Sequence, residues 1–282
     1  MIMANNWYED LNEYIKLGEP KLEEKTVAWQ TAIGLQAVDG LTTSEYLLET
    51  AKDNIEGKIT IKEANARISN YYEERSDRHV IEDTTKEADI VAGRITALLA
   101  EKAFSFTPAA WMSIHRYLFK DVFMHAGEIR TYNISKNEWV LNGKSVFYAS
   151  YDSIPMTMEY DFKTEKAFSY QNLSRNEIIK HLAQFTCDIW QIHPFCEGNT
   201  RSTAVFIIKY LNSLGYFIGN ECFAKNSWYF RNALVRANYN DFQNDIHATT
   251  IYLERFFENL LFGGNNELKN RYLHIAWQDN QK

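Results

Sequence analysis

The chain has 282 residues, 45% of them hydrophobic and 15% aromatic, which is enough apolar material for the core of one large or two small domains. Its formal net charge of −7 opposes the broad basic surface typical of nucleic-acid binding, so we expect no nucleic acid to be required. Three cysteines without a close pair argue against a disulfide framework and favour a reducing, cytoplasmic setting.

The amino-terminal segment MIMANNWYEDLNEYIKLGEP lacks the basic and apolar regions of a signal peptide, so we expect none. No window of the sequence approaches the roughly 18 uninterrupted apolar residues of a membrane span. We therefore expect no association with a membrane.

Three helices are predicted in the amino-terminal quarter of the chain. The first begins at Pro20, whose fixed φ suits the first helical position, and ends at Gly40. The second covers residues 42–57, and the third starts where Thr60 and Glu63 have the spacing of a capping box. We expect these helices to form a compact three-helix unit.

A charged run, EERSDRHVIEDTTKE, occupies residues 73–87. It is interpreted either as a joint between two domains or as the solvated face of one helix, and both interpretations stay open. Beyond it, helical patterns are expected over residues 86–103 and, after Thr107, over residues 108–123.

The composition changes between residues 126 and 150, where β-branched and aromatic residues become frequent. The dipeptide Asn142-Gly143 stands between the runs WVL and KSVFY, and this arrangement is a strong signal for a two-residue hairpin turn. We therefore expect one short β-hairpin in an otherwise helical protein.

Helices are predicted again over residues 172–192, with a capping box at Ser174 and Glu177, and over the very apolar stretch 201–214. The carboxyl-terminal third continues the helical pattern. It ends in a polar stretch, residues 263–282, which we interpret as an appendage.

The turn HPFCEGNTR lies between the predicted helices at residues 172–192 and 201–214. It contains several residues of the types that bind ligands or transfer protons. Pro194 biases His193 away from helical dihedral angles, so one helix is expected to end there and the next to begin near Thr200. The first amides of the second helix point into the turn and form an anion site, with Arg201 within reach of phosphate oxygens. Gly198 is expected to let the backbone approach a ligand closely.

An acid beside such a phosphate site implies a cation. Glu197 would repel a bound phosphate, so Mg²⁺ between the carboxylate and the phosphate is the natural inference. His193 is the residue of this turn that accepts a proton near neutral pH. Together these residues indicate phosphoryl or nucleotidyl transfer to a hydroxyl group.

The same stretch resembles the signature of the Fic (Fido) family, His-Pro-Phe-x-(Asp/Glu)-Gly-Asn-Gly-Arg-x-x-Arg. Here it reads HPFCEGNTRSTA, from His193 to Ala204, and the likeness extends over residues 85–262, including AGEIRTYNIS and FRNALVRAN. The resemblance implies a mainly α fold, a helical bundle of the Fic type with a short β-hairpin flap. It also implies transfer of AMP from ATP to a hydroxyl side chain of a target protein (AMPylation).

The roles of individual residues follow from this resemblance. It implies that His193 is the general base, that Glu197 holds the Mg²⁺ of the bound ATP, and that Phe195 anchors the loop in the core. The residues implied to contact the nucleotide are Glu197, Gly198, Asn199, Thr200, Arg201 and, in the adenine pocket, Asn232. The target protein is expected to dock along the flap, at about residues 136–148, by strand addition.

Two basic residues, Arg130 and Lys136, precede the predicted hairpin. They are interpreted as steadying phosphates or the flap, or equally as surface residues. The remaining histidines have no comparable neighbours in the sequence and are expected to be structural.

Two positions depart from the family signature. Thr200 stands where the family has glycine, and Ala204 stands where it has the second arginine. Because position 204 is one helical turn beyond Arg201, the substitution removes one contact to the terminal phosphate. Three alternatives follow: weaker hold on that phosphate, transfer of a different group such as UMP or a phosphate, or a catalytically weak scaffold that binds nucleotide or a partner protein.

The first three helices resemble the small antitoxin that partners some Fic toxins. In that family a glutamate followed by glycine or asparagine inserts against the second arginine and blocks productive ATP binding. The best alignment places Asp39 and Gly40 at these positions and Leu35 at the preceding Ser/Thr. Since the arginine partner is Ala204, both halves of one ion pair are altered together, and we expect weak inhibition.

These interpretations predict an antitoxin-like helical region over residues 1–78, a Fic domain over residues 85–262 and the polar appendage over residues 263–282.

Overall fold

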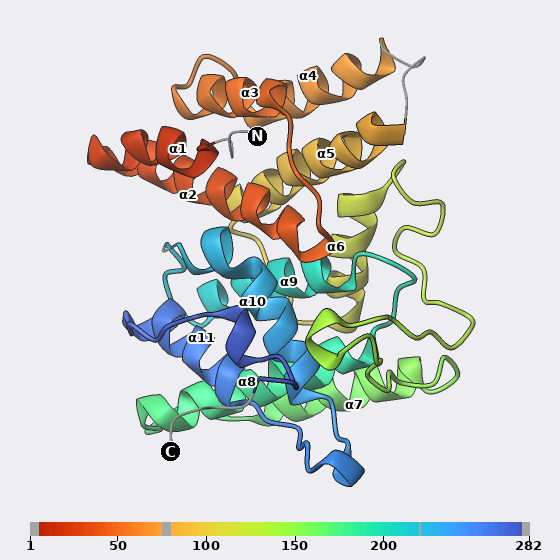
Figure 1. Cartoon of the computed structure of the whole chain (residues 1–282). Helices are drawn as coiled ribbons and strands as arrows, with labels where there is room; N and C mark the ends of the chain where they lie inside the picture. The colour runs from red at the N-terminus through yellow and green to blue at the C-terminus, as the bar shows by residue number, and fades with distance from the viewer. Residues whose placement is uncertain (1–5, 75–79, 220, 278–282) are drawn as a thin grey trace. The chain divides into compact units, whose positions relative to one another are not determined.

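The computed structural model describes residues 6–74, 80–219 and 221–277, and these are mainly helical (Figure 1). The predicted mainly α class is therefore confirmed. The chain divides into two compact units, the first made of Met1–Ala103 and Gly219–Ser227, the second of Phe104–Ile218 and Trp228–Lys282. The centre of the predicted joint, residues 75–79, lies outside the described residues. None of the described helices is long and apolar enough to cross a membrane.

The first unit contains more helices than predicted. They are α1 (Trp7–Lys16), α2 (Pro20–Gly34), the 3-10 turn η1 (Leu35–Asp39), α3 (Glu45–Ile55), α4 (Ile61–Glu73) and α5 (Val80–Ala100). The predicted helices appear as α2, α3 and α4, but α5 packs against α2 and α4, and α1 packs against α2. A separate three-helix unit is therefore not confirmed.

The ends of these helices follow their sequence signals. Pro20 occupies the first turn of α2, and Gly40 has a left-handed conformation (φ 71°) after η1. Thr60 and Glu63 form the predicted capping box at the start of α4. Each signal is local, since the capping residue satisfies backbone groups of its own first or last turn.

A buried carboxylate links three helices of the first unit. Asp89 of α5 is fully buried and accepts hydrogen bonds from the backbone amide of Ser44 (2.9 Å) and from the hydroxyl of Tyr72 (2.7 Å). Burial raises the pKa of Asp89. The carboxylate thereby joins the start of α3 and the end of α4 to α5.

The second unit holds the predicted turn between α8 and α9. Its elements are α6 (Pro108–Phe119), η2 (Trp139–Leu141), α7 (Ile154–Ala167), α8 (Arg175–Ile192), α9 (Asn199–Ser213), most of α10 (Cys222–Ala237), η3 (Phe242–Asn244), α11 (Ile251–Phe262) and η4 (Asn270–Tyr272). Helix α9 packs against α6 and α8, and α8 also packs against α7 and α11. Every residue of α9 as far as Leu211 is buried, which makes it the central helix of this unit.

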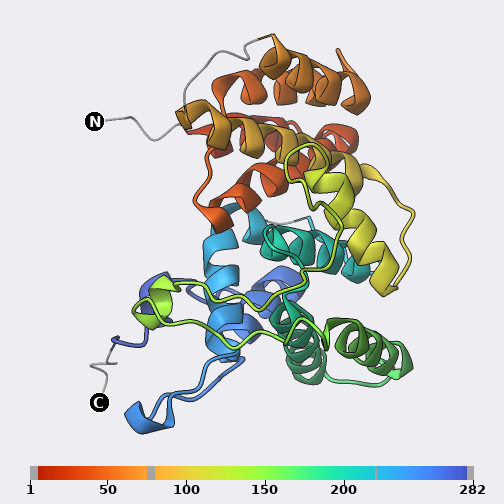
Figure 2. The same cartoon turned by 90° about the vertical axis from the view of Figure 1, so that its right-hand side faces the viewer.

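The predicted β-hairpin is wrong, because no strand forms on either side of Asn142-Gly143 among the described residues (Figure 2). The turn itself has the expected conformation: Asn142 and Gly143 have φ of 54° and 82°, and the amide of Lys144 donates to the carbonyl of Leu141 (3.1 Å). Val140 and Leu141 are both fully buried, whereas a strand sends consecutive side chains to opposite faces. The chain therefore forms η2 before the turn, and the flap (residues 136–148) is a loop.

Candidate active site

The loop between α8 and α9 begins and ends on left-handed residues. His193 ends α8 with φ 48°, and Gly198 precedes α9 with φ 73°. The end of α8 was predicted correctly from Pro194, which disfavours helical dihedral angles in the residue before it. Helix α9 begins at Asn199, one residue earlier than expected.

The imidazole of His193 is buried and held in one tautomer. Its Nδ1 lies 3.1 Å from the carbonyl oxygen of Trp190, and because a carbonyl can only accept, Nδ1 carries the hydrogen. Nε2 is then the basic nitrogen of the ring. Burial holds the pKa of His193 well below its usual 6.5, and the ammonium of Lys136 lowers it further. The ring is thus kept neutral.

The loop between α8 and α9 is held by hydrogen bonds to Asn199 and to His115 of α6. The side-chain amide of Asn199 accepts from the backbone amide of Phe195 (2.9 Å) and donates to its carbonyl (2.7 Å). Phe195 is fully buried, as expected for an anchor, and stacks on His115 with ring centroids 3.7 Å apart. His115 donates from Nε2 to the carbonyl of Glu197 (2.9 Å) while its Nδ1 accepts from the amide of Gly127 (2.8 Å).

Gly198 accommodates a protein side chain. A Cβ built on Gly198 would lie 2.4 Å from the ring of Phe119, and the predicted close approach of a ligand stays a prediction. The guanidinium of Arg201 lies 4.8 Å from the centre of the same ring. Arg201 is only 1% exposed, so a planar cation is held at the amino end of α9 by stacking.

Glu197 meets a cation from the flap. Its carboxylate accepts a hydrogen bond from the ammonium of Lys136 at 2.8 Å, with side-chain exposures of 56% for Glu197 and 24% for Lys136. Mg²⁺ beside this acid stays a prediction, and in the structure the ammonium of Lys136 lies next to the carboxylate.

The residues present fit a single Mg²⁺ bound through phosphates. No group of three or more His, Cys, Asp or Glu side chains able to hold a metal occurs in the described ranges. Mg²⁺ is commonly held by one or two carboxylates together with substrate phosphates, and the half-exposed Glu197 provides one such carboxylate at the amino end of α9.

Arg130 fastens the loop to the flap. It is 2% exposed, and its guanidinium donates to the carbonyls of His193 (2.8 Å), Tyr132 (2.7 Å) and Ala149 (2.5 Å). The interpretation of Arg130 as a surface residue is therefore wrong, and that of a residue steadying the flap is correct.

A buried ion pair fixes the flap to α10. Glu138 is fully buried and pairs with both terminal nitrogens of Arg231, at 2.6 and 3.1 Å. The hydroxyl of Tyr148 donates to the same carboxylate (3.3 Å), and the ring of Tyr148 packs on His193 with centroids 4.1 Å apart. Tyr148 of the flap thus covers the imidazole of His193, and Glu138 of the flap is bound to α10.

The sequence comparison identifies the segment that carries this loop. Residues 105–211 match the Fic/DOC family. The chain is 30% identical over 105 residues to "Protein adenylyltransferase VbhT" of Bartonella schoenbuchensis, covering 37% of this chain and 21% of that protein. It is 28% identical over 109 residues to "Probable protein adenylyltransferase y4lH" of Sinorhizobium fredii, covering 38% of this chain and 54% of that protein.

The match to these two relatives spans about a fifth of the first and about half of the second. The structure is also similar to the N-terminal Fic domain of a Bartonella effector protein from Bartonella sp. AR 15-3. The TM-score is 0.55 at 17% identity, covering 66% of this chain and 84% of that one. At this identity the likeness shows the Fic fold.

Both departures from the Fic/DOC signature are buried. The hydroxyl of Thr200 accepts a hydrogen bond from the indole of Trp190 (3.0 Å), so it links the two helices that flank the loop. Ala204 is fully buried one turn beyond Arg201. Neither Thr200 nor Ala204 adds a charge to the loop or to α9.

Three predicted site residues, Asn232, Asp39 and Gly40, belong to other elements than this loop. Asn232 of α10 is fully buried and donates to the side chain of Asn270 (2.7 Å), so its amide is tied to the carboxyl-terminal segment. Asp39 and Gly40 belong to the first unit, where Asp39 is exposed and Leu35 is fully buried. The structure gives Asn232, Asp39 and Gly40 no contact that tests their predicted roles.

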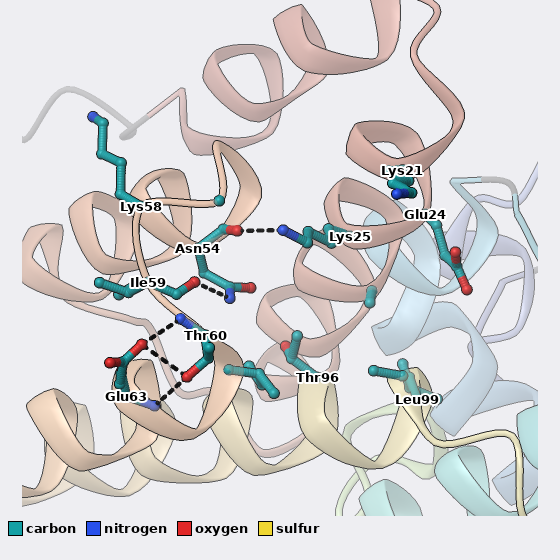
Figure 3. A pocket seen from close by; sticks show the side chains of 14 residues that line it. Lys21, Glu24, Lys25, Asn54, Lys58, Ile59, Thr60, Glu63, Thr96 and Leu99 are labelled. Atoms are coloured by element: carbon teal, nitrogen blue, oxygen red, sulfur yellow. Dashed lines mark hydrogen bonds between the residues drawn. The ribbon is translucent and has the colours of Figure 1, made fainter.

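A separate cavity of about 530 Å³ lies within the first unit, lined by α2, the α3–α4 turn and α5 (Figure 3). Lys25 reaches across it to donate to the carbonyl of Asn54 (2.8 Å), and Glu63 bonds to Thr60 in the capping box. These polar groups form hydrogen bonds at helix ends, and the loop between α8 and α9 belongs to the other unit.

Except for Arg130, sequence reasoning missed the residues from other parts of the chain that hold the loop and the flap. His115 and Arg130 hold the loop backbone, while Glu138, Tyr148 and Arg231 hold the flap. The sequence signals for them were the placement of Arg130 within AGEIRTYNIS and of Arg231 within FRNALVRAN.

Proposed function

We propose that the chain is a protein adenylyltransferase that moves AMP from ATP to a hydroxyl side chain of a target protein. The Fic/DOC match and the names of two relatives support this reaction. The observation that carries it is the imidazole of His193, whose Nδ1–H is bound to a carbonyl and whose Nε2 is left to accept a proton close to the amino end of α9.

The proposed reaction uses the loop residues as follows. The target's hydroxyl oxygen attacks the α-phosphorus of ATP, its proton passes to Nε2 of His193, and the bond to the leaving pyrophosphate breaks. The backbone at Gly198, Asn199 and Thr200 receives negative phosphate oxygens at the start of α9. Arg201 contacts the distal phosphates. Mg²⁺, when bound at Glu197, neutralises charge on the phosphate oxygens.

The remaining proposed contacts come from outside the loop. Asn232 is proposed to line the adenine pocket. The target docks along the flap, where Trp139 (48% exposed) and Phe147 (86% exposed) offer apolar contacts. No nucleic acid takes part.

The test is labelling of proteins in a cell lysate by ATP that carries the label in its adenosine or α-phosphate. We expect labelling by the unaltered chain and by His247→Ala, an exposed histidine away from the loop, and none by His193→Ala. Labelling that persists in His193→Ala would disprove the proposed base.

Two alternatives are separated by the same experiment. Because Thr200 and Ala204 depart from the signature, parallel reactions with labelled UTP and with γ-labelled ATP test transfer of UMP or of a phosphate. Binding of ATP with no histidine-dependent labelling by any of these nucleotides would instead identify a nucleotide-binding scaffold. Mass spectrometry of the modified target identifies the group transferred.

We also propose that the antitoxin-like region, residues 1–78, restrains this activity weakly, through Asp39 and Gly40. The test is Asp39→Ala in the full chain, with Glu49→Ala, another exposed acid of the same unit, as the control. A rise of less than about threefold in labelling with Asp39→Ala fits weak inhibition, which corresponds to less than about 0.7 kcal/mol. A jump of a hundredfold would reveal a strong brake.

A cytoplasmic location is proposed from the cysteines. All three are free thiols, and burial raises the pKa of Cys187 to about 12, so it is an inert core residue.

A further inference from the structure

This inference rests on the proposed function and concerns a charge that the loop lacks. The signature residue one turn beyond Arg201 is an arginine, and here it is the fully buried Ala204. A bound triphosphate still needs cations around its distal phosphates. Another part of the second unit must therefore supply the contact, or ATP is held less tightly.

The flap brings a cation to this place. The ammonium of Lys136 lies 2.8 Å from the carboxylate of Glu197, which belongs to the loop immediately before α9. It is also near enough to His193 to lower the pKa of the imidazole. Lys136 therefore contacts the proposed metal ligand and acts electrostatically on the proposed base, which places its charge at the site proposed for the phosphates of ATP.

The ion pair leaves Lys136 able to bind a phosphate. An ammonium has three N–H donors, and within the described residues only the bond to Glu197 uses one. Pairs as exposed as this one contribute little to stability, so Glu197 does not lock the side chain. The ammonium of Lys136 can thus contact Glu197 and a phosphate at the same time, or release Glu197 and bind the phosphate instead.

The other cations on the flap and its supports already have partners. The guanidinium of Arg130 donates to three backbone carbonyls, Arg231 pairs with the buried Glu138, and Lys144 pairs with Asp241. Lys136 is also held in place by its backbone, whose amide donates to the hydroxyl of Ser145 at 3.0 Å.

We propose that Lys136 replaces the missing signature arginine as the cationic contact to the distal phosphates of ATP. The flap is then part of the nucleotide site as well as the target-docking surface, and Lys136 distinguishes ATP from AMP. A lysine offers a point charge where arginine would offer a planar fork, which suits a contact shared with Glu197.

The test is calorimetric binding of α,β-methylene-ATP and of AMP, in the presence of Mg²⁺, to the full chain and three variants. Lys136→Met removes the charge, Lys136→Arg keeps it, and Lys144→Met is the matched control on the same flap. We expect Lys136→Met to weaken binding of the ATP analogue about tenfold or more and of AMP by less than about threefold. Lys136→Arg and Lys144→Met should bind both ligands nearly as the unaltered chain does.

The outcomes separate the two proposals. If the unaltered chain does not bind the ATP analogue, the proposed function fails. If it binds while Lys136→Met binds equally well, or loses both ligands to the same extent, the role of Lys136 at the distal phosphates is overturned. Because Lys136 and Lys144 are both partly exposed flap residues, equal thermal midpoints of the two methionine variants show that folding is not the cause.

Discussion

His193 owes its proposed role to a backbone partner. A carbonyl oxygen of Trp190 holds Nδ1, and a carbonyl cannot take the proton, so the tautomer with a basic Nε2 is fixed by geometry. Burial and the charge of Lys136 both oppose protonation. The ring is therefore a neutral acceptor over a wider range of pH than a free histidine.

This arrangement predicts a low pKa for His193. The pKa can be measured by proton NMR of the hydrogens bonded to the imidazole carbons. We expect titration below the usual 6.5, with the neutral form present above the shifted pKa and lost as the pH falls through it. Lys136→Met removes a like charge and should raise the pKa. The resonance is assigned by its loss in His193→Gln. A pKa at or above 6.5 in the unaltered chain would contradict this account.

At the residue scale, sequence reasoning succeeded where the cause is local. His193 and Gly198 stand out because a proline and a helix start lie beside them. By contrast, the partners of Arg130 and Arg231 are distant in sequence: His193 lies 63 residues from Arg130, and Glu138 lies 93 residues from Arg231. Periodicity and spacing carry no information about such pairs, and the fold alone reveals them.

The helix–loop–helix element depends on one small residue. Gly198 has a left-handed backbone and lies against the ring of Phe119, which in turn stacks on Arg201. A side chain at this position meets both a conformational and a steric obstacle. The glycine of the signature is therefore explained here by packing within the protein.

We expect Gly198→Ala to lower the free energy of unfolding by about 3 kcal/mol, from the strained φ and the clash with Phe119 together. Gly143→Ala is the control, because its φ is also positive (82°) but nothing lies within 4 Å of the added Cβ. It should cost only about 1 kcal/mol. Urea unfolding followed by tryptophan fluorescence measures both, and equal losses would refute the role of Phe119.

The flap shows where a correct local signal led to a wrong element. Asn142-Gly143 makes the predicted turn, but Val140 and Leu141 are buried together, and Glu138 is drawn into an ion pair. These tertiary contacts replace strand pairing. Helix α7 was missed for the opposite reason: its buried residues Ile154, Met158 and Phe162 are spaced four apart, but polar residues dilute the pattern.

Breaking the buried pair that holds the flap should be costly. Arg231→Met leaves Glu138 buried without its partner, and we expect a loss of about 3–5 kcal/mol in the free energy of unfolding. The double variant Glu138→Met/Arg231→Met should recover much of that loss. Lys144→Met, which breaks the exposed pair with Asp241, should cost less than about 1 kcal/mol. A single variant no worse than the double would show that the pair does not stabilise the flap.

For the whole molecule, the sequence predicted the mainly helical class and the Fic-type region, but no sequence pattern indicated how the amino-terminal helices are grouped. Helix α5 was assigned to the Fic domain, and the predicted boundaries 1–78, 85–262 and 263–282 remain predictions. In the structure α5 packs with α2 and α4, and residues 219–227 join the same unit. Which helices pack together in one unit depends on contacts between distant segments, and the amino-acid composition does not reveal these contacts.

A truncated chain that begins at residue 76 should therefore fold poorly. It would uncover the apolar face of α5, where Ala88, Val91, Ala92 and Ile95 are fully buried in the intact protein. We expect stronger binding of the dye ANS and a concentration-dependent shift in gel filtration, relative to the full chain. A monodisperse truncated chain without added dye binding would contradict this. Inhibition by the first unit is thus better tested by Asp39→Ala.

The contribution of residues 219–227 to the first unit sets an order of events during synthesis. The hydroxyl of Ser227 donates to the carbonyl of Gly34, and the hydroxyl of Tyr8 to the carboxylate of Glu221, across 193 and 213 residues of chain. On the ribosome Ser227 and Glu221 are therefore made long after the residues that they bind. The first unit stays incompletely covered until residues 219–227 have been made, so a nascent chain stalled before that segment does not complete this unit.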